Sequence, residues 1–259
     1  MLLIESNQQY RAISDNVEEV KAVTEAFAQS VLFGFKIVET SGGVYNLDAT
    51  PFLLRDAHGV AKRLKQRKEG AYKLDADRSA VYKEALFNFP DNTELEALVT
   101  FAGDGKGKEV QSVTPTSELI SVRMHHSFIR LPDDAYTPRA FHPESGYFYG
   151  SFFDYAAPIA DDMQQRYILR HRLEKKNSDQ KSSPAVEPIV YYIDRGCPEP
   201  VKSALIEGGQ WWSQAFEAAG FQDAFMIKEL PADAHPLDVR YNMIPVSYTH
   251  LTLPTTPYV

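Results

Sequence analysis

Histidine is the residue type in this chain most suited to acid–base or metal chemistry, because imidazole titrates near neutral pH and ligates transition metals. None of the histidines precedes a glutamate and no two lie four positions apart, so the H-E-x-x-H pattern of zinc peptidases does not occur in the sequence. They are His58, His125, His126, His142, His171, His235 and His250. A serine nucleophile in a G-x-S-x-G turn is missing as well. We therefore expect this chain to hold no catalytic, metal-binding or cofactor-binding residue.

The adjacent pair His125-His126 is the most suggestive arrangement among these histidines. Successive side chains of a strand point to opposite faces, so the two imidazoles are not expected to bind one metal ion together. We predict a structural or surface role for the pair, with Arg123 and His125 on the exposed face.

Glycine, cysteine and tryptophan mark three further places where ligand chemistry could be sought. The glycine-rich run 103–107 lacks the G-x-x-x-x-G-K spacing of a phosphate loop and is expected to be a flexible connection between two strands. Cys197 is the single cysteine, which excludes an internal disulfide, and it is expected to be a small structural residue at a strand–helix junction. Trp211 and Trp212 fall within an apolar helical repeat and are expected to pack in a core.

Two helices are predicted in the first part of the chain, over about 15–32 and about 50–70. Asp15 is the expected cap of the first helix, with Glu18 three positions later in an acidic variant of the capping box. Thr50-Pro51 suits the first turn of the second helix, because proline is tolerated where no backbone donor is needed.

Strands are predicted where apolar residues alternate or β-branched and aromatic residues gather. A strand is expected over 33–38, and alternation of apolar and polar residues predicts two more over 93–101 and 120–128. The aromatic run 147–155 predicts another. Residues 174–187 are polar and nearly free of apolar side chains, so a linker and a domain boundary are expected there.

Beyond this linker the expected order is strand, helix, strand, strand. Residues 188–194 form an apolar β-branched run, and apolar residues then recur every three or four positions from 198 to 219 before Gly220. Two further strands are expected over 224–230 and 239–244. The whole chain is therefore expected to be α+β, with a mixed N-terminal domain and a second, β-α-β-β segment.

Several runs are more specific than this order of elements. In the second segment they are Pro188–Gly196, Glu199-Pro200, Ala204–Gly208, Trp211–Phe221 and Asp238–Asn242. In the first they are Tyr10–Asp15, Phe27–Val31, Asp48–Thr50, Phe52–Gly59, Asn88–Glu94, His125–Phe128 and His171–Lys176. Through these runs the chain resembles, over about residues 1–244, a family of large bacterial zinc-dependent metalloproteases. Members of that family carry a domain of unknown function ahead of a metzincin-like catalytic domain.

The resemblance implies an N-terminal α+β domain over 1–173, a polar linker over 174–187, and the first β-α-β-β of a metzincin-like catalytic domain over 188–244. It implies a full-length parent that hydrolyses peptide bonds of a polypeptide substrate with zinc-activated water. Zinc is expected in that parent and not on this chain, which is expected to be inactive. The aromatic residues of 147–155 are expected to be buried against the catalytic segment.

The last residues, 245–259, change composition abruptly: they contain three prolines, four threonines and no charged residue. We expect a non-native, loosely packed tail, in which His250 is not a ligand. The family resemblance suggests the periplasm or cell envelope for the parent. No signal peptide is recognisable at the start of this chain, where Met1–Ile4 is too short for an apolar signal core.

Composition limits the alternatives. The formal charge of −8 argues against a nucleic-acid binder, because no basic surplus neutralises phosphates, and no run of about 18 apolar residues predicts a transmembrane segment. The second hypothesis for function is a non-catalytic envelope module that binds a polypeptide or a glycan through the N-terminal domain. An intact gene in which H-E-x-x-H follows Ile244 would favour the peptidase.

Overall fold

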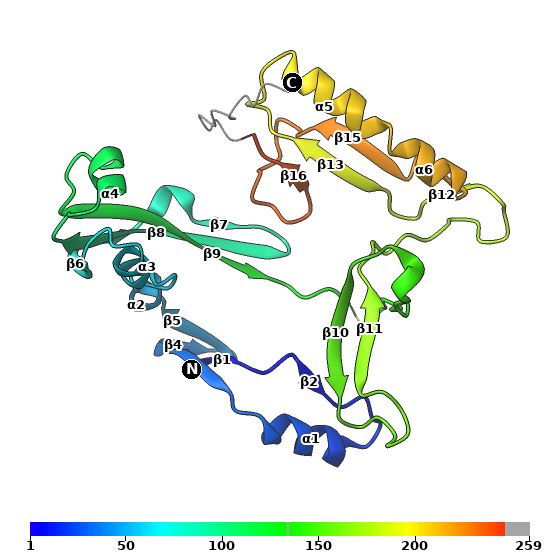
Figure 1. Ribbon diagram of the computed structural model, residues 1–259, viewed down its shortest axis with the longest axis horizontal. Coiled ribbons are helices and arrows are strands. Elements are labelled where there is room, and N and C mark those ends of the chain that lie inside the picture. The colour runs from blue at the N-terminus through cyan, green and yellow to red at the C-terminus, as the bar shows by residue number, and fades with distance from the viewer. Residues whose placement is uncertain (134, 247–259) are drawn as a thin grey trace, which may run out of the picture. The chain divides into compact units, whose positions relative to one another are not determined.

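The computed structural model describes residues 1–133 and 135–246, and the chain is a mixed α+β protein as predicted (Figure 1). It divides into two compact units: unit 1 comprises Met1–Asn88 and Thr93–Leu169, and unit 2 comprises Phe89–Asn92 and the chain from Arg170. Of the tail expected over 245–259, residues 247–259 lie outside the described residues. Among the described residues, none of the helices has the length and apolar character needed to span a bilayer.

Unit 1 contains most of the strands. Its elements are β1 (Leu2–Glu5), β2 (Tyr10–Arg11), α1 (Val17–Ala26), β3 (Ser30–Gly34), β4 (Lys36–Ser41), β5 (Val44–Asp48), α2 (Thr50–Leu53), α3 (Val60–Gln66), β6 (Tyr72–Val81), the 3-10 turn η1 (Lys83–Ala85), β7 (Phe87–Asn88), β8 (Asn92–Gly103), α4 (Lys108–Val113), β9 (Leu119–Ile129), the 3-10 turn η2 (Pro143–Ser145), β10 (Tyr149–Asp154) and β11 (Gln164–Ile168).

The core of unit 1 lies on one face of the sheet formed by β6, β8, β7 and β9, in which β8 pairs with each of the others. Val99 and Phe101 of β8 and Met124 of β9 are almost fully buried, and they pack with Phe52 and Leu53 of α2. Apolar residues of α3 complete this layer. Burial of each large side chain contributes about 1.5–3 kcal/mol, so the sheet and the two short helices hold each other in place. The strands predicted over 93–101 and 120–128 are confirmed as parts of β8 and β9.

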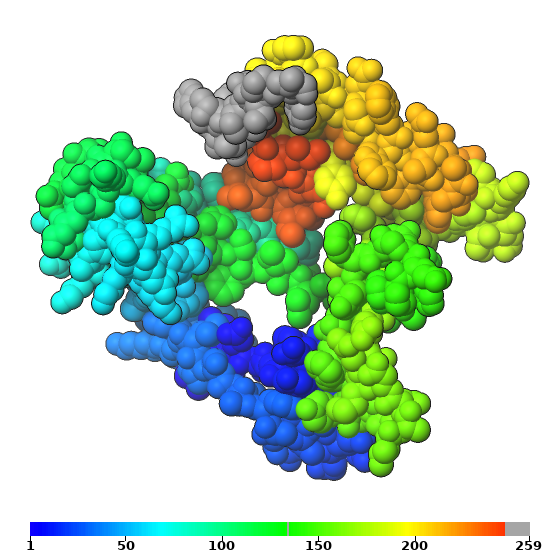
Figure 2. Space-filling model, viewed as in Figure 1, coloured from blue at the N-terminus to red at the C-terminus, as the bar shows by residue number. Residues whose placement is uncertain are grey.

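The first predicted helix is shorter than expected. Asn16, not Asp15, caps it, by accepting a hydrogen bond from the Glu18 backbone N–H at 3.1 Å, and α1 ends at Ala26. Residues 30–34 form β3 because they pair antiparallel with β1, and cross-strand pairing overrides the helical pattern there. No residue of α1 is buried, and Figure 2 shows the side chains of this blue N-terminal part at the surface.

The second predicted helix is divided in two. α2 ends at Leu53, and Gly59 adopts a left-handed backbone with φ of +64° just before α3. The carboxylate of Asp56 then accepts hydrogen bonds from the backbone N–H groups of Val60 and Ala61, at 2.7 and 3.1 Å. An acidic acceptor at the new helix start stabilises the break, because it satisfies donors that have no partner within the helix.

Three small sheets complete unit 1. β1 pairs with β3, β4 pairs with β5, and β10 pairs antiparallel with β11 and parallel with the short β2. β10 confirms the strand predicted in the aromatic run. β6 and β11 were not predicted from the sequence, because neither has a clean alternation of apolar residues.

Unit 2 is built on a three-stranded parallel sheet in the order β15-β13-β16 (Figure 1). Its elements are β12 (Ser183–Pro184), β13 (Ile189–Ile193), α5 (Val201–Gln210), α6 (Ser213–Ala218), β14 (Phe221–Gln222), β15 (Phe225–Glu229) and β16 (Asn242–Ile244). α5 and α6 form the crossover from β13 to β15 and contact β15. The order strand, helix, strand, strand is confirmed, although the single predicted helix is two helices separated at Trp211-Trp212.

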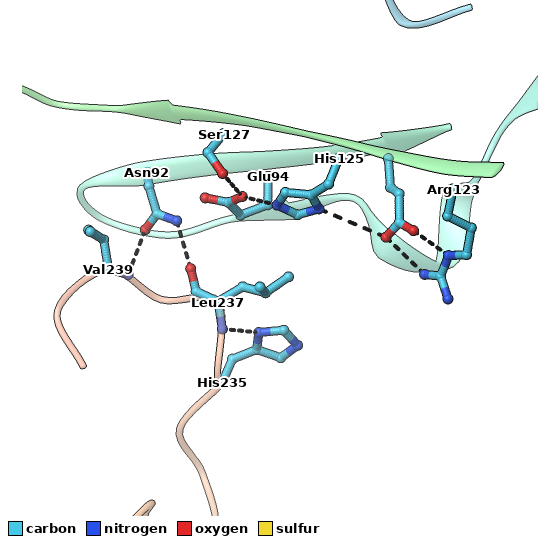
Figure 3. Close-up of polar contacts among 9 residues, drawn as sticks. Asn92, Glu94, Arg123, His125, Ser127, His235, Leu237 and Val239 are labelled. Atoms are coloured by element: carbon cyan, nitrogen blue, oxygen red, sulfur yellow. Dashed lines mark hydrogen bonds and ion pairs between the residues drawn. The ribbon is translucent and has the colours of Figure 1, made fainter. Parts of the chain in front are cut away.

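The turn Phe89–Asn92 groups with unit 2 through the side chain of Asn92. This amide donates to the Leu237 carbonyl at 2.8 Å and accepts from the Val239 N–H at 3.1 Å (Figure 3). The ring of His235 lies 5.3 Å from that of Phe89. These contacts hold the loop between β15 and β16, which contains no helix or strand of its own.

Residues 174–187, expected to be a linker, make specific contacts. The Lys176 N–H donates to the Pro184 carbonyl at 2.9 Å, and the Asn177 N–H donates to the Ser183 hydroxyl at 3.0 Å. Ser183 is fully buried, and β12 pairs with β14. The polar composition is explained by side chains that satisfy the backbone of a tight turn.

Candidate functional site

The polar face of the β8–β9 pair carries a group of ionisable side chains that contact one another. Alternation along β8 sends Ala97, Val99 and Phe101 into the core, so Glu94 and Glu96 project from the opposite face. β9 alternates in the same way. Both carboxylates are nevertheless buried, which requires partners for them.

Glu94 receives two hydrogen bonds on a single carboxylate oxygen. Its Oε2 lies 2.5 Å from Nε2 of His125 and accepts from the hydroxyl of Ser127, also at 2.5 Å (Figure 3). The side chain of Glu94 is only 4% exposed, against 36% for His125. Short hydrogen bonds to a buried carboxylate are among the stronger ones in proteins, so they link β8 firmly to β9.

Glu96 continues this row of side chains. Arg123 binds it with two nitrogen atoms: Nη2 donates to Oε2 at 2.8 Å and Nε donates to Oε1. Nδ1 of His125 lies 3.9 Å from the same carboxylate, so the imidazole stands between Glu94 and Glu96. The hydrogen bond and charge of Glu96 raise the pKa of Arg123, whose guanidinium also lies 4.2 Å from the ring centre of Tyr82. We call these five residues, with Ser127 at one end and Arg123 at the other, the β8–β9 polar row.

The geometry of the β8–β9 polar row does not suit nucleophilic catalysis. A serine nucleophile needs a base that takes its proton, and in the familiar triads this base is a histidine held by a carboxylate. Here Ser127 donates to Glu94, and Nε2 of His125 is bonded to the same oxygen. The imidazole is therefore not available to Ser127, and the arrangement cross-links two strands. Among the described residues, no group of three or more His, Cys, Asp or Glu is arranged to hold a metal ion.

His126 lies on the opposite face, so the prediction that the two adjacent histidines diverge is confirmed. Its ring centre is 5.1 Å from that of Phe52 and 6.1 Å from that of His58, with the two imidazoles nearly parallel. Burial lowers the pKa of His126, and electrostatic repulsion from Arg55, His58 and His125 lowers it further. The histidine pair thus joins two different environments, a polar row and the edge of the core.

The glycine-rich run 103–107 has its polar groups committed to neighbours within unit 1. Asp104 accepts from the Ala71 N–H at 2.8 Å and pairs with Lys106 at 2.9 Å, and the hydrogen bond from Lys106 lowers the pKa of Asp104. The N–H of Gly107 donates to the carbonyl of Glu69 at 2.9 Å. The connection is also not a simple hairpin, since α4 follows it before β9. These contacts explain the glycines without a bound phosphate.

The structure agrees with the expectation for Cys197 but not with the expectation for the two tryptophans. Cys197 lies between β13 and α5, is 3% exposed, and packs with Ile193 and Ile227, in agreement with a small structural role. The prediction that Trp211 and Trp212 pack in a core is wrong, because they are 68% and 62% exposed. The physical reason is that a different side of α5 from the one predicted faces the sheet.

That side carries Ile206, Gly209 and Gln210. Ile206 packs on the small core of unit 2, and the amide of Gln210 donates to the Ile227 carbonyl at 3.3 Å. The apolar repeat through Val201 and Leu205 points away from the sheet, and both residues are exposed. Periodicity correctly identified a helical segment, and Phe216 of the same repeat stacks on Phe225 of β15. Within α5, however, the repeat lies on the face that points away from the sheet.

The aromatic run 147–155 also differs in part from expectation. Tyr147, Phe148, Tyr149 and Tyr155 are exposed, whereas Phe152 is buried. Within unit 1, the ring of Phe153 packs on Tyr10 of β2, and one edge of the exposed Tyr155 ring contacts Phe27, which follows α1.

Glu94 and Glu96 were not predicted as site residues, although the sequence contains a signal for them. They alternate with Leu95 and Ala97 on a predicted strand, so they share one face, and Arg123 and His125 share a face of the next long strand. Two like charges on one face favour a neighbouring strand that supplies cations. Knowing that these strands are neighbours would have been sufficient to predict the pairing.

The N-terminal part of the chain matches a known family. Residues 1–176 match the family described as Domain of unknown function (DUF5117). No curated protein and no solved structure matches the chain significantly.

Proposed function

Because this chain belongs to the DUF5117 family, whose function is unknown, its activity has to be inferred from the rest of the molecule, and we propose that it is the N-terminal part of a zinc-dependent metallopeptidase of the metzincin type. The full-length parent would hydrolyse peptide bonds at the cell envelope or in the periplasm. This chain would contribute the DUF5117 domain and the first elements of the catalytic domain.

The observation that carries the proposal is the β-α-β-β arrangement of unit 2. β13, α5 with α6, β15 and β16 occur in this order along the chain, with only the two-residue β14 between α6 and β15. β13 is the central strand of the parallel sheet. Parallel strands joined by helical crossovers are typical of α/β domains that are covered on both faces. The opening of a metzincin catalytic domain has this order, and the runs Pro188–Gly196 and Trp211–Phe221 resemble that family.

The residues of this chain do not fit a zinc site. A catalytic zinc needs three protein ligands with an open fourth position, and no such group occurs among the described residues. The sequence also contains no H-E-x-x-H. We therefore assign no step of peptide hydrolysis to a residue of this chain, and we expect the chain by itself to be inactive.

The test begins with the uninterrupted gene. The proposal expects H-E-x-x-H within roughly a hundred residues after Ile244. The full-length protein should then cleave casein, and chelation or a Glu→Gln change in that motif should abolish cleavage. The present chain, assayed in parallel, is the matched negative control.

Two results would contradict the proposal. One is a native continuation that ends or lacks the motif. The other is stoichiometric zinc on the present chain together with cleavage that a chelator removes, since the catalytic site would then lie within these residues.

A further inference from the structure

A groove in unit 1 lies between residues 5–10 and the end of α1. One hollow of about 640 Å³ is lined by Lys21, Thr24, Glu25, Phe27, Ala28 and Gln29. A second of about 490 Å³ is lined by Glu5, Ser6, Asn7, Gln8, Gln9, Ala28 and Ser30. A small third hollow shares Phe27 and Gln29 with the first and Asn7 with the second, so the three are parts of one groove.

One aromatic residue, Phe27, lines the first hollow, and Tyr10 joins it only at the third, which measures about 40 Å³. Other aromatic rings support Phe27 from behind. Tyr10 stacks on Phe27 with ring centres 4.5 Å apart and an angle of 12° between the planes. Tyr155 meets both rings edge-on, at 5.6 and 5.4 Å. β2 and β10 hold these rings, because Phe153 is the strand partner of Tyr10 and its ring packs on the same tyrosine. Rings fixed in this way lose little entropy when a ligand packs on them.

Amides and hydroxyls line the rest of the groove. Asn7 uses its side-chain oxygen to accept from the Gln9 and Tyr10 N–H groups, at 2.8 and 3.3 Å, which fixes the turn and leaves its NH₂ group directed elsewhere. Gln8, Gln9 and Gln29 are exposed. Each amide offers both a donor and an acceptor, which is what a ligand rich in hydroxyl groups requires.

The charges of the groove are few and opposed. Lys21 and Glu25 are four residues apart on α1, and Glu5 is the one further charged residue among those that line the hollows. A surplus of one carboxylate argues against a polyanionic ligand such as a phosphate chain. An extended polypeptide would be expected to need apolar pockets for alternate side chains, whereas these walls are mainly polar.

We propose that this groove binds a neutral polysaccharide, whose apolar C–H face packs on Phe27, supported by the stacked ring of Tyr10, while its hydroxyl groups bond the amides of Gln8, Gln9 and Gln29. Tyrosine and phenylalanine suit such contacts because they combine a large apolar surface with a fixed geometry. The site lies wholly in unit 1 and does not depend on the proposed peptidase activity, so either assignment can fail without the other.

Isothermal titration calorimetry of the whole chain tests the proposal. The probes are three neutral oligosaccharides (cellohexaose, chitohexaose and maltohexaose), an acidic oligogalacturonate and reduced, carboxymethylated lactalbumin as a polypeptide. At least one neutral oligosaccharide should bind saturably at one site. Gln8→Ala and Gln29→Ala should each weaken that binding roughly 2- to 10-fold, as expected for loss of one hydrogen bond.

The matched control is Gln214→Ala, which removes an exposed glutamine from α6 in unit 2 and should leave binding unchanged. Phe27→Ala should weaken binding more than either glutamine variant, with circular dichroism used to check that α1 remains folded. The proposal is overturned if no neutral oligosaccharide binds, if Gln214→Ala weakens binding as much as Gln29→Ala, or if only the acidic or polypeptide probe binds.

Discussion

Two adjacent glycines near the end of α5 should respond in opposite directions to the same substitution. A Cβ at Gly208 would meet nothing within 4 Å, whereas a Cβ at Gly209 would lie 2.5 Å from Cγ1 and 3.1 Å from Cδ1 of Ile227. Ile227 is a β-branched residue of β15 and is 5% exposed, so its side chain has little freedom to move aside.

The magnitude follows from two contributions. Alanine in place of glycine in a helix favours folding by about 0.5–1 kcal/mol, and this gain applies to both positions. Overpacking a well-filled contact costs about 1–3 kcal/mol and applies only to Gly209. Gly208→Ala should therefore raise the free energy of unfolding by about 0.5–1 kcal/mol. The free energy of unfolding of Gly209→Ala should be about 1–3 kcal/mol lower than that of Gly208→Ala. The gain in helix propensity is the same in both variants, so the difference reports the overpacking alone.

The assay is urea denaturation followed by circular dichroism, with hydrogen-exchange mass spectrometry of peptides spanning 201–218 to assign the change to unit 2. A further variant isolates the contact: in an Ile227→Ala background, which removes Cγ1, the deficit of Gly209→Ala relative to Gly208→Ala should disappear. Equal effects of the two alanines in the unaltered chain, or a deficit that persists in the Ile227→Ala background, would refute the packing described for α5.

Three further predictions concern the polar row, the histidine on the core face and the tryptophans. Glu94→Gln should lower the free energy of unfolding by about 1–3 kcal/mol, because His125 and Ser127 lose a charged acceptor. The control Glu118→Gln, at an exposed position, should change the free energy of unfolding by less than about 0.5 kcal/mol. Equal effects of the two substitutions would argue against the β8–β9 polar row. Burial, and secondly nearby positive charge, lowers the pKa of His126 from its ordinary value of 6.5. The unfolded chain therefore binds a proton at this histidine more readily than the folded chain does, and the folded state loses stability as the pH falls below 6.5. His126→Phe should flatten this loss in urea midpoints measured from about pH 7 to 5, and an unchanged profile would contradict the assignment. The two exposed tryptophans should emit as in water and be quenched by iodide almost as fully as in urea; blue-shifted, protected emission would contradict their exposure.

Local patterns in the sequence were sufficient to predict the long strands and the existence of most helices. Leu95 to Phe101 alternate with polar residues, and that alternation follows from backbone geometry within a single strand. The apolar run at β13 is equally self-contained, since a short β-branched segment has few other stable conformations. The mixed α+β class and the order of elements in unit 2 follow from these same local signals.

The candidate site was only half visible in the sequence. His125 and Arg123 could be placed on one face of a strand, but their partners could not, because a hydrogen bond between strands depends on which strands are neighbours. The groove residues had a weaker signal still. The run Ser6 to Gln9 is polar and would suit any surface loop, and only the fold brings Tyr10 and Phe27 together beside it.

What the sequence determined by itself was where the chain is extended, where it is helical and which residues alternate, because those properties arise from each segment's own backbone and side chains. The tertiary structure decided which face of a segment is buried and where a pattern yields to a neighbour. Residues 30–34 became a strand through pairing with β1, and α5 turned Ile206 and Gly209 toward β15 while Trp212 remained exposed. Such choices depend on contacts between segments that are far apart in the chain, and periodicity within one segment carries no information about them.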